Sequence, residues 1–317
     1  MPVDPLRPGY AALTRFAASG NVSRFRAEGS VGVPTLCRVH HSPLGRVTVL
    51  ELTRSGAPHA HSHPHLLLKL GGADGCFDVD GSVYALTDTQ AILVNSWQPH
   101  AYRHAAGAPS ALVLAVYFAP RASSAAASAG SLRFAANCMQ VTHCARASAE
   151  AIAHELDRFS TCDARSVEDS LRVLLDTTPG VRDEATSSHG DSATAPARAR
   201  PDRRVARCMA FMREHLAARE DLGELGARFG LSRPHLFHLF RRSTQLTPAM
   251  YWNTLRMEFA IDRLARRDGT VGRLAHDLGF TDPGNFTRFF RAIQGVAPSD
   301  YREAALKASR PAQSAIL

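Results

Sequence analysis

The chain has 317 residues, which exceeds the size of most single domains and predicts about two of them. Its composition, 45% hydrophobic and 21% charged, is globular and excludes fibrous and wholly disordered proteins. The net charge is +8: residues 202–317 carry 19 basic and 12 acidic side chains, and residues 1–201 carry 18 and 17. The positive charge of the last third indicates a polyanionic partner.

Neither the first residues nor the apolar runs of the chain suggest export or membrane insertion. The first ten residues, MPVDPLRPGY, lack the apolar core of a signal peptide, and the longest apolar run, Ala111 to Ala119, is far below the roughly 20 residues of a membrane helix. The six cysteines are scattered without a Cys-x-x-Cys pair, which favours reduced thiols. We expect a cytoplasmic protein with no membrane partner.

Short apolar runs alternate with turn residues between about residues 31 and 120, a pattern typical of a β-sandwich or small barrel. Asp80-Gly81 lies between two such runs and predicts a tight hairpin. The clearest runs are Val47–Leu52, Leu66–Leu70, Cys76–Val79, Ala91–Val94 and Ala111–Phe118.

From about residue 148, apolar side chains recur at every third or fourth position, as in a helix. Two amphipathic helices are predicted within residues 148–175, and their apolar stripes are Ala149, Ile152, Leu156 and Phe159, then Val167, Leu171 and Leu174. These stripes suit either the β domain or a second subunit. Residues 179–201 have almost no large apolar side chain and are rich in Ser, Ala, Pro and Gly, which predicts a flexible linker.

Everything after Asp202 has helical periodicity and includes an internal repeat. Residues 222–251 match residues 271–301, with Gly230 and Pro234 corresponding to Gly279 and Pro283. Each copy predicts a helix, a glycine turn and a second helix. Ser232 is placed to cap one second helix, and Asp282 followed by Pro283 to begin the other.

This arrangement is typical of a helix-turn-helix, whose second helix enters the major groove of DNA. Leu236, Leu239 and Phe240 form one inward face, and Phe286, Phe289 and Phe290 form the other. Pro248 to Arg267 predicts a connecting helix of about 30 Å, close to the roughly 34 Å between successive major-groove faces. The outward residues are Arg233, Pro234, Phe237, His238, Arg241 and Arg242, then Pro283, Gly284, Asn285, Thr287, Arg288 and Arg291.

Residues 202–304 resemble the DNA-binding domain of the AraC/XylS family of bacterial transcription regulators. The resemblance is carried by Gly279-Phe280-Thr281-Asp282-Pro283, then Phe286, Arg288, Phe290, Gly295, Pro298, Tyr301 and Arg302. It implies a reader of operator DNA that contacts RNA polymerase. It also implies base-edge contacts by Pro234, Phe237 and His238, then by Pro283, Gly284, Thr287 and Arg288.

The chain departs from the family pattern at Gln245, where glycine is usual, and at Ala297, where a Ser or Thr cap is usual. The first reading helix offers Pro, Phe and His, which favours contacts with thymine methyls and DNA shape. Arg288 is the side chain best suited to pair bidentately with guanine. We therefore expect it to make the strongest single base contact.

Histidines concentrate in the N-terminal half. His59, His61, His63 and His65 alternate, so on a strand all four would project from one face, and Pro64 restricts that strand to an edge or an end. Trp97 and His100 follow a turn downstream. A His-x-His pair followed by Pro-His resembles the motifs of a cupin barrel, and the resemblance covers roughly residues 45–120. The predicted effector pocket consists of six residues: His59, His61, His63, His65, Trp97 and His100.

Metal-dependent cupins add a glutamate after the His-x-His pair, and Leu66-Leu67-Leu68-Lys69 stands at that place. The pattern leaves three alternatives open: barrel histidines without an ion, contact with an organic effector, or a divalent ion at His61, His63 and His100. No catalytic residue is predicted.

The predicted fold is therefore multidomain, an N-terminal all-β cupin-like barrel with a helical pair and a C-terminal all-α double helix-turn-helix. The expected divisions are residues 1–144 (sensor), 145–178 (helical pair for dimerisation), 179–201 (linker) and 202–317 (DNA-binding), with helix-turn-helix units at about 222–243 and 270–293. The expected function is effector-controlled transcription regulation by a homodimer, not an enzyme and with no obligatory cofactor. The alternative is a cupin metalloenzyme or metal sensor fused to a DNA-binding domain.

Overall fold

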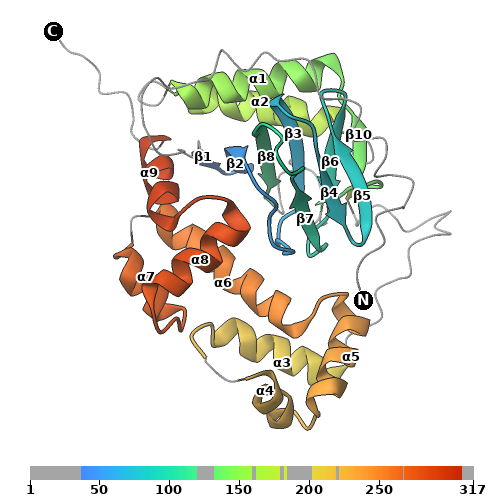
Figure 1. The fold of residues 1–317 in the computed structure, drawn as a ribbon, viewed down its shortest axis with the longest axis vertical. Helices are drawn as coiled ribbons and strands as arrows, with labels where there is room; N and C mark the ends of the chain where they lie inside the picture. The colour runs from blue at the N-terminus through green and yellow to red at the C-terminus, as the bar shows by residue number, and fades with distance from the viewer. Residues whose placement is uncertain are drawn as a thin grey trace.

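The computed structural model describes residues 37–119, 132–158, 162–178, 182–183, 202–218, 221–266 and 268–308. Residues 37–140 are rich in strands, and residues 202–308 are helical; they are called the β region and the helical region below (Figure 1). None of the helices in these ranges combines the length and apolar character that crossing a bilayer requires.

The β region contains a six-stranded sheet and a three-stranded sheet. The larger sheet has the order β1 (Cys37–Ser42), β2 (Gly45–Leu52), β8 (Ala111–Phe118), β3 (His65–Gly72), β6 (Gln90–Val94) and β10 (Cys138–Gln140). The smaller has the order β5 (Ser82–Leu86), β4 (Gly75–Val79) and β7 (His100–Arg103).

The predicted strands are confirmed: Cys76–Val79 lies in the smaller sheet and the other four runs lie in the larger sheet, with most of their apolar side chains buried. All eight residues of β8 are buried, as expected for a strand covered on each side. The Asp80-Gly81 turn joins β4 to β5, with Val79 paired to Ser82. Its two residues have positive φ, 53° and 82°, as a two-residue hairpin of type I′ requires.

The described strands do not close into the expected single barrel through a continuous series of hydrogen-bonded pairs. Among the described strands, no hydrogen-bonded pairing joins the six-stranded sheet to the three-stranded sheet. The two sheets instead share an apolar core that includes Leu67, Phe77, Val94, Tyr102 and Val113. The architecture is therefore two packed sheets.

Two helices, α1 (His143–Asp157) and α2 (Ala164–Thr177), cover the outer face of the larger sheet (Figure 1). The Thr142 and Asp163 side chains cap them by accepting hydrogen bonds from backbone N–H groups. Their apolar stripes are buried against the chain's own sheet, whereas the expected dimerisation role would have placed them against a second subunit. Phe159 lies outside the described residues.

Two residues of the predicted linker lie within the described ranges. Arg182 and Asp183 form the short strand β11 (Arg182–Asp183), which pairs with β9 (Leu132–Arg133). The remaining residues of 179–201 lie outside the described ranges.

Seven helices make up the described helical region, and they begin where the sequence provides caps or prolines. They are α3 (Arg203–Glu214), α4 (Leu222–Arg228), α5 (Arg233–Thr244), α6 (Pro248–Ala265), α7 (Val271–Asp277), α8 (Pro283–Gln294) and α9 (Pro298–Ala308). Asp221 and Glu224 form a capping box at α4, and Asp282 caps α8. Ser232 stands at the cap position of α5 but makes no side-chain cap bond.

The repeat folds as two similar helix pairs, α4–α5 and α7–α8, at opposite ends of α6 (Figure 1). The 18 residues of α6 correspond to a rod of about 27 Å. Gly230 and Gly279 form the turns between the paired helices with φ of 69° and 80°. Gln245, where the family pattern has glycine, also adopts the left-handed region, with φ of 67°.

We expect Gly279→Ala to lower the free energy of unfolding more than Gly230→Ala. Both substitutions place a Cβ in the left-handed region, which costs about 1–2 kcal/mol. A Cβ at Gly279 would also lie 2.3 Å from the Ala217 backbone oxygen, whereas a Cβ at Gly230 meets nothing within 4 Å. Urea unfolding of the two variants measures the difference, and equal losses would contradict the close approach.

Candidate nucleic-acid interface and histidine cluster

The outer faces of α5 and α8 carry the side chains predicted to meet DNA. On their inner faces, Leu236 and Phe240 of α5 and Phe286 and Phe290 of α8 are fully buried, and these contacts fix the orientation of both helices. Phe237, Gly284 and Thr287 are partly buried. The other nine predicted positions are exposed: Arg233, Pro234, His238, Arg241, Arg242, Pro283, Asn285, Arg288 and Arg291.

The start of α8 is ordered by its own side chains. Asp282 Oδ1 accepts a hydrogen bond from the Gly284 backbone N–H at 3.1 Å, and Pro283 needs no such partner at the first helical position. The Arg288 guanidinium donates to the Asn285 side-chain oxygen one turn earlier. This contact holds Arg288 along the exposed face, where a DNA base or phosphate would be reached.

The other end of α8 packs on the β region, which the sequence alone did not indicate. The Ala57 backbone N–H donates to the Ala292 carbonyl at 3.2 Å. Leu50 and Val39 of the β region are buried in the same cluster as Phe290 and Tyr301. One face of α8 thus meets the chain itself while the face with the predicted DNA contacts is exposed.

A second set of contacts joins α6 to the loop before β3. The Thr254 hydroxyl is shared between the Ala60 carbonyl at 3.1 Å and the Met250 carbonyl of its own helix at 2.9 Å. The Trp97 ring, in the loop between β6 and β7, stacks on that of Tyr251 with centroids 5.0 Å apart. Glu258 accepts from the Ser62 backbone N–H at 3.4 Å. The helix that connects the two repeats is therefore also the helix that contacts the β region.

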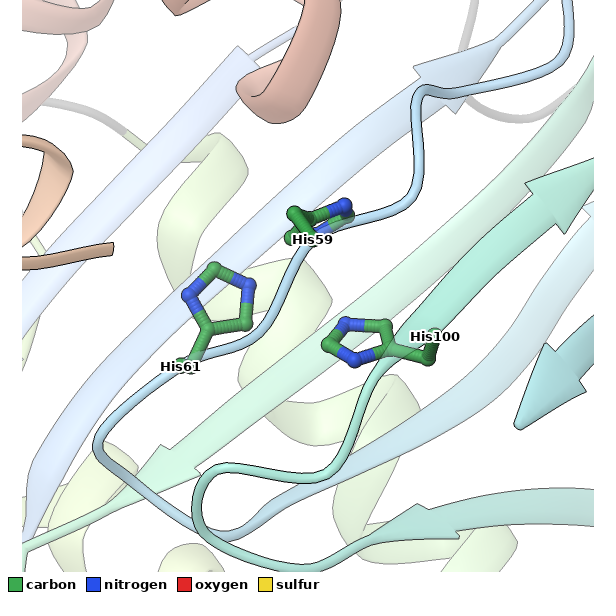
Figure 2. Close-up of side chains that lie close together, drawn as sticks. All are labelled: His59, His61 and His100. Carbon is green, nitrogen blue, oxygen red and sulfur yellow. The ribbon is translucent and has the colours of Figure 1, made fainter. Parts of the chain in front are cut away.

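Three histidines converge beside this interface. One imidazole nitrogen from each of His59, His61 and His100 lies within 4.8 Å of the other two (Figure 2). His59 and His100 are brought together by an isolated antiparallel bridge with reciprocal backbone hydrogen bonds of 3.0 and 2.8 Å. His65 completes the group of rings, with its centroid 4.7 Å from that of His100 and 5.1 Å from that of His61.

Burial controls the ionisation of this cluster. His61, His65 and His100 are almost completely inaccessible, and burial holds the pKa of each well below its usual value. These imidazoles are therefore neutral near pH 7. Burial also opposes ionisation of Glu258, but hydrogen bonding from His61 and His63 outweighs it and keeps the pKa of this carboxyl well below its usual value.

A cavity of about 610 Å³ lies where the histidine cluster, the smaller sheet and α8 meet. His59, His65, His100 and Tyr102 line it from the β region, and Arg288 and Arg291 line it from α8. Its volume is in the range that holds a small organic molecule, and its wall combines apolar side chains with a few polar ones. Both halves of the chain therefore contribute to one candidate binding site.

Residues 225–304 match the model of a helix-turn-helix domain. The MmsAB operon regulatory protein of Pseudomonas aeruginosa is 36% identical over 94 residues, which cover 30% of this chain and 31% of that protein. The transcriptional activator RhaS of Escherichia fergusonii is 31% identical over 102 residues, 32% of this chain and 37% of that protein. The helical region of this chain is therefore similar to a helix-turn-helix domain and to part of each of these two regulators.

Two solved structures are similar to this chain, over different lengths. An apo ToxT variant from Vibrio cholerae aligns with 84% of this chain and 99% of its own, at 12% identity and a TM-score of 0.46. The DNA-binding domain of AdpA in complex with a target DNA aligns with 33% of this chain and 93% of its own, at 31% identity and a TM-score of 0.31. The two curated relatives are matched over only about a third of their own length.

The histidines that come together in the structure differ from the set that the sequence suggested. Residues 59–64 do not form a regular strand, so the four alternating histidines do not share one face. His61 and His100 of the predicted metal group lie together, but the third member of the cluster is His59. His63 is about one-third exposed, and its Nδ1 lies 3.7 Å from Glu258 Oε2.

Of the other predicted pocket residues, one lies in the cavity and one packs against the helical region. His65 lines the cavity, whereas Trp97 packs against Tyr251 of α6. Glu258 is the functional candidate that the sequence reasoning missed. It lies in the connecting helix, nearly 200 positions from the histidines, and no local pattern links it to them.

We expect Thr254→Val to destabilise the full chain by about 1–2 kcal/mol, because the buried Ala60 carbonyl loses its donor. Thr177→Val is the matched control: it removes a hydroxyl that bonds only to carbonyls of its own exposed helix, and a change within about 0.5 kcal/mol is expected. Urea unfolding measures both variants. Equal effects would show that the contact between α6 and the β region contributes nothing.

Proposed function

We propose that this chain is a sequence-specific, DNA-binding transcription regulator of the AraC type. The observation that carries the proposal is the pair of similar helix pairs at the two ends of α6, each with exposed arginines on its outer face. In this proposal residues 222–243 and 270–293 are two helix-turn-helix units within a DNA-binding domain of residues 202–317. Residues 1–144 are a cupin-like sensor, 145–178 a helical pair and 179–201 the linker.

The spacing of the reading helices supports binding to one face of a duplex. A rod of about 27 Å, extended by the width of the helix pairs, approaches the roughly 34 Å between successive major grooves. Arg233, Arg241 and Arg242 on α5 and Arg291 on α8 are placed to neutralise phosphates, while Arg288 and the first residues of each helix read base edges. Their exposure leaves these side chains accessible to DNA.

The relatives suggest how DNA binding is used. RhaS is named as a transcriptional activator and the MmsAB protein as an operon regulator. By analogy, this chain acts on operator DNA, contacts RNA polymerase, functions in the cytoplasm as a homodimer and is not an enzyme. The dimer contact lies outside the buried stripes of α1 and α2, because the chain's own sheet already covers them.

A small effector bound in the cavity would couple sensing to DNA binding. The cavity is lined by His59 and His100 on one side and by Arg288 and Arg291 of the second reading helix on the other. A ligand there contacts residues of both halves and changes the position or freedom of α8. A ligand can shift the equilibrium between two arrangements of α8 only through a difference in its affinity for them. To change DNA binding, the effector must therefore bind one arrangement of α8 better than the other.

The proposal is tested by selecting DNA sequences from a random duplex pool with the full-length chain. Two helix-turn-helix units on one rod predict an enriched sequence with two blocks about one helical turn, roughly 10 base pairs, apart. A pool without enrichment would contradict sequence-specific recognition. A single block would contradict the role of the second unit.

We expect Arg288→Ala to weaken binding to the selected sequence by about 1–3 kcal/mol and to weaken binding to random DNA much less. The reason is that a bidentate contact with guanine distinguishes base pairs, whereas a phosphate contact does not. Fluorescence anisotropy at one fixed salt concentration measures both affinities.

Arg172→Ala is the matched control, because Arg172 is an exposed arginine of α2 that pairs with Glu168 and Asp169 in the other half of the chain. Its affinity for either DNA should equal that of the unmodified chain. Equal losses on both DNAs with Arg288→Ala would remove the assigned base contact and leave Arg288 as a phosphate contact.

A further inference from the structure

We propose that His59, His61 and His100 bind a divalent transition-metal ion of the zinc class, and that Glu258 of the DNA-binding domain positions His61 for it. The inference deepens the proposed function, on which its regulatory meaning rests: the ion would link the sensor to the helix that connects both DNA-reading units. The ligand set differs from the one the sequence suggested, with His59 in the place of His63.

The three rings satisfy the first requirement of such a site, which is convergence. Their ligand nitrogens lie within 4.8 Å of one another, so a single ion can reach all three with modest side-chain movement (Figure 2). His61 and His100 are only 2% and 3% exposed, and the bridge between His59 and His100 holds their backbones. Three protein ligands with an open fourth position are typical of zinc sites that also bind a second molecule.

Hydrogen bonds at the Nδ1 atoms of two of the rings select the correct tautomer. His59 Nδ1 lies 2.7 Å from the Ala57 carbonyl oxygen and His100 Nδ1 lies 3.0 Å from the Gln98 carbonyl oxygen. Because a carbonyl can only accept, both Nδ1 atoms carry the proton and both Nε2 atoms keep a lone pair. Metal-binding histidines in proteins are ordinarily fixed in this way.

Glu258 faces the Nδ1 atom of His61, which has no closer hydrogen-bond partner among the described residues. Its Oε1 lies 3.5 Å from His61 Nδ1, which places a carboxylate, a histidine and the candidate ion in sequence. Such a carboxylate fixes the ring and makes its other nitrogen a stronger ligand. Glu258 belongs to α6, so this contact exists only while the helical region packs on the β region.

His65 adds an independent indication that a ligand belongs here. The residue is 1% exposed, its Nδ1 faces the His63 carbonyl oxygen at 3.3 Å, and its Nε2 has no hydrogen-bond partner among the described residues. A buried polar atom without a partner is costly. Beside three convergent histidines, this nitrogen can accept a hydrogen bond from a water molecule held by the ion in the cavity.

The test is a metal titration of the full-length chain after treatment with a chelator. Co²⁺ is added first, since its visible spectrum reports coordination by nitrogen ligands, and Zn²⁺ then displaces it to give the affinity. One ion per chain is expected. His59→Ala and His100→Ala should lose stoichiometric binding, and Glu258→Gln should bind 10–100 times more weakly, the usual effect of removing such a carboxylate.

Two histidine controls separate this site from unspecific binding. His104→Ala should bind as the unmodified chain does, because His104 bonds to Tyr102 and Ala108 outside the cluster. His63→Ala should also keep the ion, since its ring is not among the three convergent ones. Thermal unfolding identifies any variant that fails to fold. If a histidine variant does not fold, the metal affinities of the unmodified chain and of Glu258→Gln still test the proposal.

Four outcomes overturn the proposal or part of it. An unmodified chain that binds no stoichiometric ion removes the site, and unchanged affinity in Glu258→Gln removes the link to α6. Loss of the ion with His63→Ala but not with His59→Ala, or loss of binding with His104→Ala, removes the assigned ligand set. Since this titration contains no DNA, its failure leaves the proposed regulator standing, and a failed DNA selection leaves the metal result standing.

Discussion

The two halves of the chain meet around a partly buried carboxylate, Glu258, on the helix that joins the two repeats. A buried charge is tolerated only when other groups compensate for lost hydration. Here the Ser62 backbone N–H and the rings of His61 and His63 face it, and all three belong to the loop before β3. This contact fixes α6 against the β region, and through α6 it fixes both helix pairs.

Consequently α8 has two roles in one short helix. Its beginning is exposed and capped by Asp282, as a DNA-reading helix requires, while the Ala292 carbonyl near its end is bonded to the loop at Ala57. Arg288 and Arg291 lie between these ends and line the cavity shared with the histidine cluster. Any molecule that binds in the cavity therefore meets residues proposed to contact DNA. If the β region is the sensor and α8 the second reading helix, as proposed, communication between them needs no long pathway, since the two are in direct contact.

The sequence predicted well whatever depends on local periodicity and capping. The strands, the Asp80-Gly81 hairpin, the two glycine turns and the buried faces of α5 and α8 all follow from apolar spacing and from residues with special backbone preferences. It predicted less well whatever depends on the path of a loop. Alternation of four histidines implied a strand, but Pro64 delays β3 until His65, and the preceding loop turns His63 toward Glu258 and His59 toward His100. The partner of the α1 and α2 stripes was also undecidable, because an amphipathic face does not specify which apolar surface covers it.

The central claim is that the β region and the helical region are docked through α6 and α8 in solution. Amide hydrogen exchange of the full chain tests it most directly, at two neighbouring residues. The Gly56 N–H bonds to the Tyr102 carbonyl within the β region, and the Ala57 N–H bonds to the Ala292 carbonyl of α8. Docking predicts that both amides exchange slowly. Slow exchange at Gly56 with exchange at Ala57 as fast as in an unstructured peptide would contradict the account, because the β region would then be folded with α8 released from it.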